Sequence, residues 1–202
     1  MRWRSAERTL GSRGVDDLVE RLQERLRSGQ RAIEDEFGRA VPLPPASGAD
    51  VVASESRLGF TLTPLLRRIY AEVGNGGFGP GYGLLGILNG AADDRKHNAV
   101  TLYEEYRQHD PDDPLWAWPE RLLPVCHLGC AMYLCVDCSD AQGPVTWFEP
   151  NPHERGKPWT DSFFHLADST EAWLSAWVSS NDLFTRLVEG SASARRRSSA
   201  TS

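Results

Sequence analysis

Four cysteines in the second half of the sequence form its most metal-like group of side chains. Three, four and two residues separate them in turn: Cys126, Cys130, Cys135 and Cys138. A zinc site built from four thiolates usually combines two C-x-x-C pairs, and these spacings supply only one. We therefore interpret the four as buried free thiols in a reducing compartment, with a zinc site as the alternative.

The five histidines show no metal-ligand spacing, and no local motif of a nucleophile surrounds any serine or cysteine. They are His97, His109, His127, His153 and His165. A metal-dependent or hydrolytic enzyme built on the Cys and His residues is therefore our third hypothesis. We expect no catalytic residues, no metal and no cofactor.

A glycine-rich segment at 74–83 contains the residue type that lets a loop surround a phosphate. It lacks the Lys-Ser/Thr ending of a P-loop. It also leads from a predicted helix into a predicted strand at 84–88, the reverse of the nucleotide-binding order. We interpret this segment as a structural turn.

An acidic, proline-bounded loop combines charge with a large aromatic surface: Asp110, Asp112, Asp113, Trp116 and Trp118. Tryptophan is strongly enriched at the energetic centres of protein interfaces, so these residues are candidates for binding a partner. The alternative is that both tryptophans pack beneath the loop and leave the aspartates in solvent.

Acidic residues predominate in the chain, but not at its ends. The sequence of 202 residues carries 22 Lys+Arg and 28 Asp+Glu; residues 1–14 hold four Arg and one Glu, and 190–202 hold three Arg. The rest has 15 basic and 27 acidic side chains, a net charge of −12. Such a body repels nucleic acid and attracts a basic protein; solubility alone is the other interpretation.

Three regions divide the chain: a flexible basic N-terminus at 1–14, one domain at 15–189 and a disordered Ser/Arg tail at 190–202. No apolar run approaches the length of about 20 residues that a membrane helix needs. The N-terminus also lacks the apolar stretch of a secretory signal, so we expect a cytoplasmic protein.

Hydrophobic periodicity and turn residues predict one α+β domain, in which the apolar runs after residue 121 form an antiparallel meander. Helices are expected at 16–27, 50–58, from Thr63-Pro64 to Gly74, at 95–107, and from Ser169 or Thr170 onward. The second should start near Ser47 or Asp50 and end at Gly59 as its C-cap, and Thr63 should be the N-cap of the third. A second apolar piece includes Ile33 and Phe37, and the closing helix continues after a break through Leu183–Val188. Strands are expected at 84–88, 122–128, 131–137, 144–149 and 163–166.

Several motifs, in order, resemble the SUKH superfamily, which includes fungal regulators of cell-wall synthesis and bacterial immunity proteins against toxins. The most specific is Glu55-x-x-Leu58-Gly59-Phe60-x-Leu62-x-Pro64, followed by Leu66, Tyr70 and Asn75-Gly76-Gly77-x-Gly79. Later parts of the resemblance are Leu123-Pro124-Val125, the run from Gly129 to Tyr133 with Asp137, and Ser169-x-x-x-Trp173-Leu174-x-x-Trp177.

The resemblance implies an α+β fold with a largely antiparallel sheet flanked by helices. It also implies binding to another protein, and it supplies no catalytic residues. Our leading hypothesis is a non-enzymatic immunity protein that binds a basic toxin domain; a regulatory scaffold is the alternative. We expect an acidic face around the 110–118 loop with Asp93, Asp94, Glu104 and Glu105. Glu55 is a further candidate for partner binding, or for a local cap or ion pair.

Overall fold

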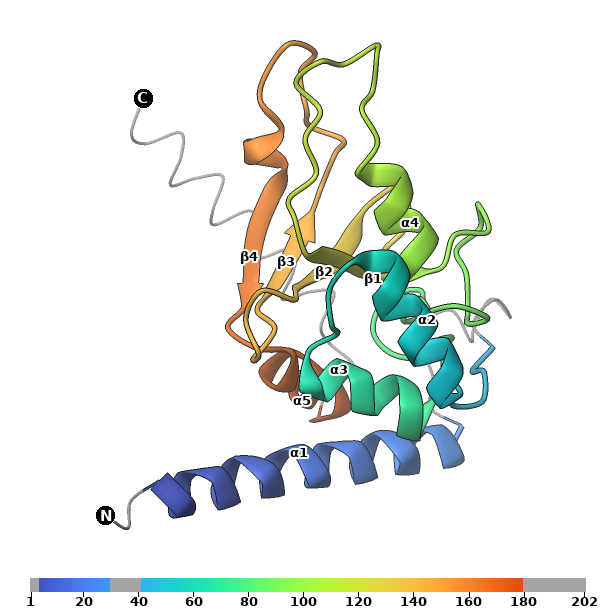
Figure 1. The fold of residues 1–202 in the computed structure, drawn as a ribbon, viewed down its shortest axis with the longest axis vertical. Helices are drawn as coiled ribbons and strands as arrows, with labels where there is room; N and C mark the ends of the chain where they lie inside the picture. Colours follow the sequence, from blue (N-terminus) through green and yellow to red (C-terminus); the bar gives the residue numbers. More distant parts are fainter. Residues whose placement is uncertain (1–3, 30–40, 180–202) are drawn as a thin grey trace.

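The structure is a computed structural model that describes residues 4–29 and 41–179 (Figure 1). Predictions for three stretches lie outside the described residues: the apolar piece around Ile33 and Phe37, the continuation through Leu183–Val188, and the tail at 190–202. Among the described residues, no helix has both the length and the hydropathy needed to cross a bilayer.

A four-stranded antiparallel sheet forms the centre of the protein, and its strands follow one another in chain order. They are β1 (Leu122–His127), β2 (Tyr133–Asp137), β3 (Val145–Phe148) and β4 (Phe163–Ala167). Each lies within two residues of its prediction. The sequence-based α+β class with an antiparallel sheet is therefore confirmed.

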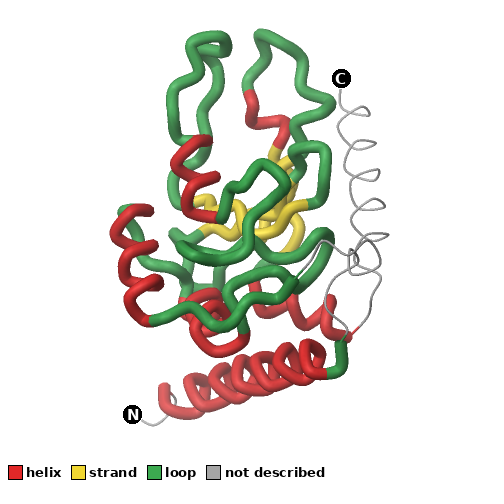
Figure 2. The backbone as a smooth tube through the Cα atoms, turned by 90° about the vertical axis from the view of Figure 1, so that its right-hand side faces the viewer, coloured by secondary structure: helices red, strands yellow, loops and turns green. Residues whose placement is uncertain are grey.

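Helices surround this sheet on several sides (Figures 1 and 2). The long helix α1 runs along the base of the molecule, packed against α5 and the π-helical turn η2, while α4 packs against β1 and α2 against α4. The bounds are α1 (Arg4–Arg27), α2 (Gly48–Leu58), α3 (Pro64–Arg68), η2 (Ile69–Val73), α4 (Ala99–Tyr106), the 3-10 turn η3 (Trp159–Ser162) and α5 (Thr170–Ser179).

Helix α1 begins at Arg4, twelve residues before the predicted start at Asp16. The predicted part is confirmed by its apolar stripe, because Leu18, Val19 and Leu22 are buried. The sequence before Asp16 has no such periodic pattern of apolar residues. Arg, Ala, Glu and Leu nevertheless favour helix intrinsically, which hydrophobic periodicity does not detect.

The helix boundaries that the sequence marks with capping residues are confirmed. Ser47 and Asp50 form a capping box at the start of α2, which ends at Gly59 in the left-handed conformation. The Leu66 N–H donates to Thr63 Oγ1 at 3.3 Å, and Pro64 follows at the first helical position of α3. The predicted helix start at residue 95 is wrong. Helix α4 begins at Ala99, because Asn98 is its N-cap.

The predicted strand at 84–88 is wrong. Leu84 forms only an isolated bridge with Cys126, and the Leu85 N–H donates to the Val125 carbonyl at 2.8 Å. Beyond this point the chain turns away from β1, since the Asn75 side chain binds the Ile87 N–H and the Leu88 carbonyl instead.

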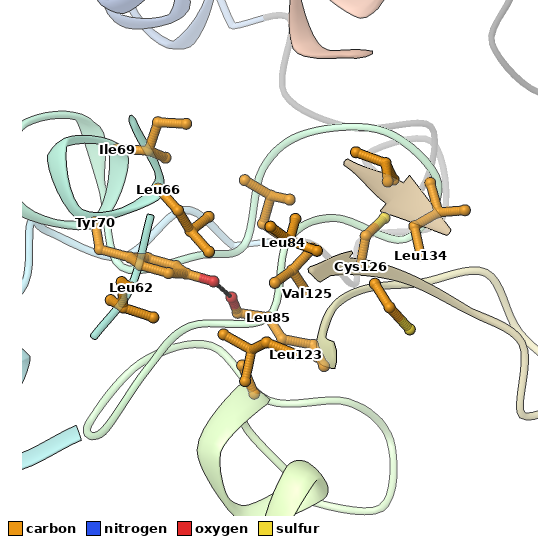
Figure 3. Packing of buried hydrophobic residues seen from close by; sticks show 14 of the residues in the cluster. Leu62, Leu66, Ile69, Tyr70, Leu84, Leu85, Leu123, Val125, Cys126 and Leu134 are labelled. Atoms are coloured by element: carbon orange, nitrogen blue, oxygen red, sulfur yellow. Dashed lines mark hydrogen bonds between the residues drawn. The ribbon is translucent and has the colours of Figure 1, made fainter. Parts of the chain in front are cut away.

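The part of the hydrophobic core shown in Figure 3 lies between α3, η2, the 84–87 segment and the first two strands. Tyr70 is fully buried in it, and its hydroxyl donates to the Leu85 carbonyl at 2.9 Å. Leu66, Ile69 and Val125 are also fully buried. The core therefore holds the 84–87 segment beside β1 and fixes the loops on either side of it.

Candidate functional site

The glycine-rich segment is a structural turn, as predicted. The Asn75 side chain is almost fully buried, with Oδ1 accepting from the Ile87 N–H at 2.8 Å and Nδ2 donating to the Leu88 carbonyl at 3.0 Å. At Gly77, whose φ is +79°, a Cβ atom would lie 2.0 Å from the Val41 carbonyl oxygen. Beside them, Gly76 approaches the Gly86 backbone and Gly79 the Leu84 side chain. The family-like motif therefore fixes close backbone approaches.

Beside this turn lies a hollow of about 660 Å³, which we call the Gly-loop pocket. It lies between the 82–85 segment, the 90–96 loop and the β1–β2 turn at 127–130. The side chains that line it and carry chemistry are Tyr82, Asp93, Asp94, Lys96, His127 and Cys130.

Two aromatic rings, Tyr82 and His127, line one wall of the Gly-loop pocket, and a third, Tyr133, packs behind His127. The ring centroids of Tyr82 and His127 are 5.4 Å apart, and His127 stacks on Tyr133 at 5.1 Å. Burial lowers the pKa of His127 below its ordinary value, and the charges of Asp94 and Asp93 only partly oppose this shift. His127 is therefore neutral at pH 7.

Asp93 does not belong to an exposed acidic face. It is only 7 % exposed, and its carboxylate accepts from the Tyr133 hydroxyl at 2.9 Å and from the His97 N–H at 2.8 Å. Tyr133 lies 40 residues further along the chain on β2, so no local pattern reveals this pairing. Asp94, its neighbour in sequence, is exposed at the rim of the pocket.

Both tryptophans of the acidic loop pack beneath it. Trp118 is 2 % exposed, and its Nε1 donates to the Leu122 carbonyl at 2.7 Å. Trp116 is half-buried, and its Nε1 donates to the Tyr106 carbonyl at 2.8 Å. For the tryptophans the structure thus follows the alternative interpretation, because these indoles supply packing instead of an exposed aromatic surface.

A further tryptophan joins the acidic loop to the loop before β4. Trp159 Nε1 donates to Asp113 Oδ2 at 2.8 Å, and its ring packs edge-on against Trp116 with centroids 4.8 Å apart. The His153 ring stacks on the Trp159 ring, with centroids 3.6 Å apart. We call residues 107–118 and 149–161 together the tip; both loops extend from the same end of the molecule in Figure 1.

No sequence motif points to Trp159 or His153, because residues 151–161 contain none. A tryptophan within an otherwise polar loop was the available signal. The Asp113 carboxylate is bound inside the tip. Its Oδ2 accepts from Trp159 Nε1, and its Oδ1 accepts from the Leu115 N–H at 3.1 Å. Asp110 and Asp112, by contrast, are exposed.

Arginines partly neutralise the rest of the expected acidic face. Arg57 binds the carboxylate of Glu104 through two nitrogens, and Arg95 Nη2 lies 2.8 Å from Glu105 Oε1. His97 Nε2 also lies 2.9 Å from the second oxygen of Glu105. Within residues 41–179, the exposed acids of the expected face without a cation partner are Asp94, Asp110 and Asp112.

Glu55 is engaged within its own chain. Its Oε1 accepts from the Leu62 N–H at 3.1 Å, and its Oε2 lies 3.5 Å from Arg67 Nη1. Leu58, three residues later, is buried, and Gly59 then ends α2. This part of the family-like motif therefore closes the turn between α2 and α3.

The four cysteines are free thiols in unequal surroundings. Cys126 and Cys135 are buried, Cys138 is half-buried and Cys130 is exposed. Burial raises the pKa of the first two, and it raises the pKa of Cys138 to about 12. In the part of the chain that the structure describes, no three His, Cys, Asp or Glu side chains are placed to hold a metal ion.

The fold and the site define a class: α+β proteins in which helices pack around an antiparallel meander, here with a hollow beside β1 and a loop tip at one end. The chain belongs to the SMI1/KNR4 family (SUKH-1), whose family model matches residues 45–176. The match extends from the start of α2 into α5 and includes the whole sheet. Immunity proteins are among the members of this family. No curated protein matches the chain significantly.

Proposed function

We propose that this protein is a non-enzymatic immunity protein that binds and neutralises a toxin domain. The observation that carries the proposal is the match to the SUKH-1 family over 45–176. Binding to another protein requires complementary surfaces and no assembled catalytic group. The exposed charges described above indicate which kind of surface the partner presents.

The charge of the domain favours a basic partner. Residues 41–179 contain nine Lys+Arg and eighteen Asp+Glu, a formal charge of −9. A field of this sign accelerates the approach of a positively charged domain, such as a nuclease, and opposes the approach of nucleic acid. Asp110 and Asp112 place two of these charges on the exposed side of the tip.

The tip is suited to binding because its two loops are already held together. Trp159 joins them through its hydrogen bond to Asp113 and its edge-on contact with Trp116. A surface that is ordered before contact loses less conformational entropy on binding than two free loops. The tip therefore presents Asp110 and Asp112 in a fixed arrangement.

The first test is capture of partners by the tagged full chain from its own host lysate, at low and high salt. We expect one stoichiometric basic toxin domain, bound less tightly at high salt. Its expression alone should stop growth, and co-expression with this protein should restore it. Capture of several housekeeping proteins without such a toxin would favour the regulatory scaffold and overturn the proposal.

Charge reversal tests the role of the tip with the captured toxin domain. The double variant Asp110→Lys, Asp112→Lys should slow association about tenfold at low salt and flatten its salt dependence. Asp17→Lys with Glu20→Lys is the matched control, because it makes the same charge change on an exposed part of α1, at the other end of the molecule (Figure 1). Equal rates for both double variants would contradict steering by the tip.

A further inference from the structure

We propose that the Gly-loop pocket receives a basic side chain, an arginine guanidinium or a lysine ammonium, of the partner protein. The inference rests on the proposed function in one respect, because it assumes that the ligand is part of a partner protein. It is carried by the shape of the pocket, by its aromatic wall and by its excess of carboxylates.

The β1–β2 turn shapes the pocket by letting an aromatic ring lie against the backbone. Gly129, Cys130 and Ala131 all have positive φ, of 83°, 49° and 59°. A Cβ atom on Gly129 would lie 2.6 Å from Cε2 of Tyr82. The absence of a side chain at this one position therefore sets the place of the Tyr82 ring at the pocket wall.

Tyr82 offers this ring to solvent. It is 38 % exposed, which makes it one of four large hydrophobic residues exposed in the described part of the chain. The neighbouring His127 is neutral at pH 7, so it does not repel a cation beside Tyr82. A cation over an aromatic face is attracted by the negative charge of the π system. The wall thus suits a flat guanidinium especially well.

The charged groups of the pocket favour a cation and disfavour an anion. Asp94 is exposed at the rim, and Asp93 lies behind it with its carboxylate held by the Tyr133 hydroxyl and the His97 N–H. Among the lining residues that the structure describes, Lys96 is the one cation. Two carboxylates oppose this single ammonium, and a phosphate or a carboxylate of a ligand would meet both.

Lys96 opposes an incoming cation through the charge of its ammonium group. It is exposed, and no hydrogen bond or ion pair from its ammonium is present within the described residues. Because a lysine side chain is long and flexible, it can leave the pocket at little cost. Removal of its charge should therefore strengthen cation binding, an effect opposite in sign to that of removing Asp94.

The probe is Nα-acetyl-L-arginine amide, titrated at millimolar concentration into the ¹⁵N-labelled full chain. We expect shifts of the backbone amides of Gly83, Gly90 and Gly129, which surround the pocket. The citrulline analogue has the same shape without the charge, and it should bind at least about tenfold more weakly. Equal binding of both compounds, or shifts confined to the tip, would overturn the proposal.

Variants assign the binding energy to particular side chains. Asp94→Asn should weaken arginine binding severalfold, Tyr82→Ala should abolish it, and Tyr82→Phe should retain it. Lys96→Gln should strengthen it. Asp140→Asn is the matched control, because it removes an exposed aspartate in the β2–β3 turn that does not line the pocket. An Asp94→Asn protein that binds as the parent does would refute the role of the carboxylate.

The two proposals fail separately. If the arginine probe binds as expected but the protein captures no toxin, the pocket stands and the immunity function falls. If a toxin is captured and Tyr82→Ala and Asp94→Asn bind it as tightly as the parent, the immunity function stands and the pocket proposal falls.

Discussion

Substitution of Asn75 by alanine should destabilise the protein by removing two internal hydrogen bonds at once. Its amide satisfies the Ile87 N–H at 2.8 Å and the Leu88 carbonyl at 3.0 Å, and Ile87 is fully buried. A buried polar group left unpaired costs about 1–3 kcal/mol, so the two losses together amount to about 3 kcal/mol. For a chain of this length that corresponds to a fall in Tm of about 6–12 °C.

Urea unfolding followed by the fluorescence of the seven tryptophans measures this loss. Asn75→Asp separates the two bonds, because it keeps an acceptor for the Ile87 N–H and removes the donor to Leu88. Hydrogen exchange at the Ile87 amide should therefore be fast in Asn75→Ala and slow in Asn75→Asp. Gln108→Ala, an exposed substitution, should change stability by less than about 0.5 kcal/mol. A loss below about 1 kcal/mol for Asn75→Ala would refute the reasoning.

Three further outcomes follow from the described contacts. The exposed thiol of Cys130 should react quickly with a maleimide, while the buried thiols of Cys126 and Cys135 react only on unfolding. A fast phase in Cys130→Ser equal to that of the parent would contradict this. The pKa of His127 is lowered in the fold, so the unfolded chain binds a proton at this residue more readily than the folded chain does. The free energy of unfolding, measured with urea, should therefore decrease as the pH falls through the ordinary histidine range near 6.5. Trp159→Phe removes the hydrogen bond to the half-buried Asp113 and should cost about 1–2 kcal/mol in the same assay; an unchanged midpoint would show that this bond does not hold the tip.

The parts of the fold that were predictable from the sequence are those whose signals are local. Ser47 and Gly59 mark the two ends of α2 through their own capping geometry. The meander was predictable because short apolar runs alternate with turn residues from Leu122 to Ala167. These signals act within a few residues, so no knowledge of the tertiary structure was needed.

The 84–88 segment and Asp93 were mispredicted because distant residues decide their conformation. Residues 84–88 have the composition of a strand, but Asn75 competes for their backbone groups from twelve or thirteen positions away. Asp93 resembles a surface carboxylate in the sequence, and the Tyr133 hydroxyl binds it inside the protein. Local patterns do not report such pairings.

The candidate site was predictable in its charge but not in its geometry. The acidic character of the 110–118 loop follows directly from composition, and Asp110 and Asp112 are exposed as expected. Composition does not reveal whether a loop tryptophan faces solvent or the core, and Trp118 faces the core. The Gly-loop pocket was missed because Tyr82, Asp94 and His127 meet there from three separate segments.

The connection between the two loops of the tip determines which parts of these loops can change during evolution. Residues 108–112 and 154–157 are all exposed and lie outside the sheet, whereas Trp159 and Asp113 hold the base on which both turns stand. The outer turns are therefore free to change in sequence or length while the base stays intact. Under the proposed function, in which the tip binds the partner, exchange of these two turns would change the partner while the fold stays the same.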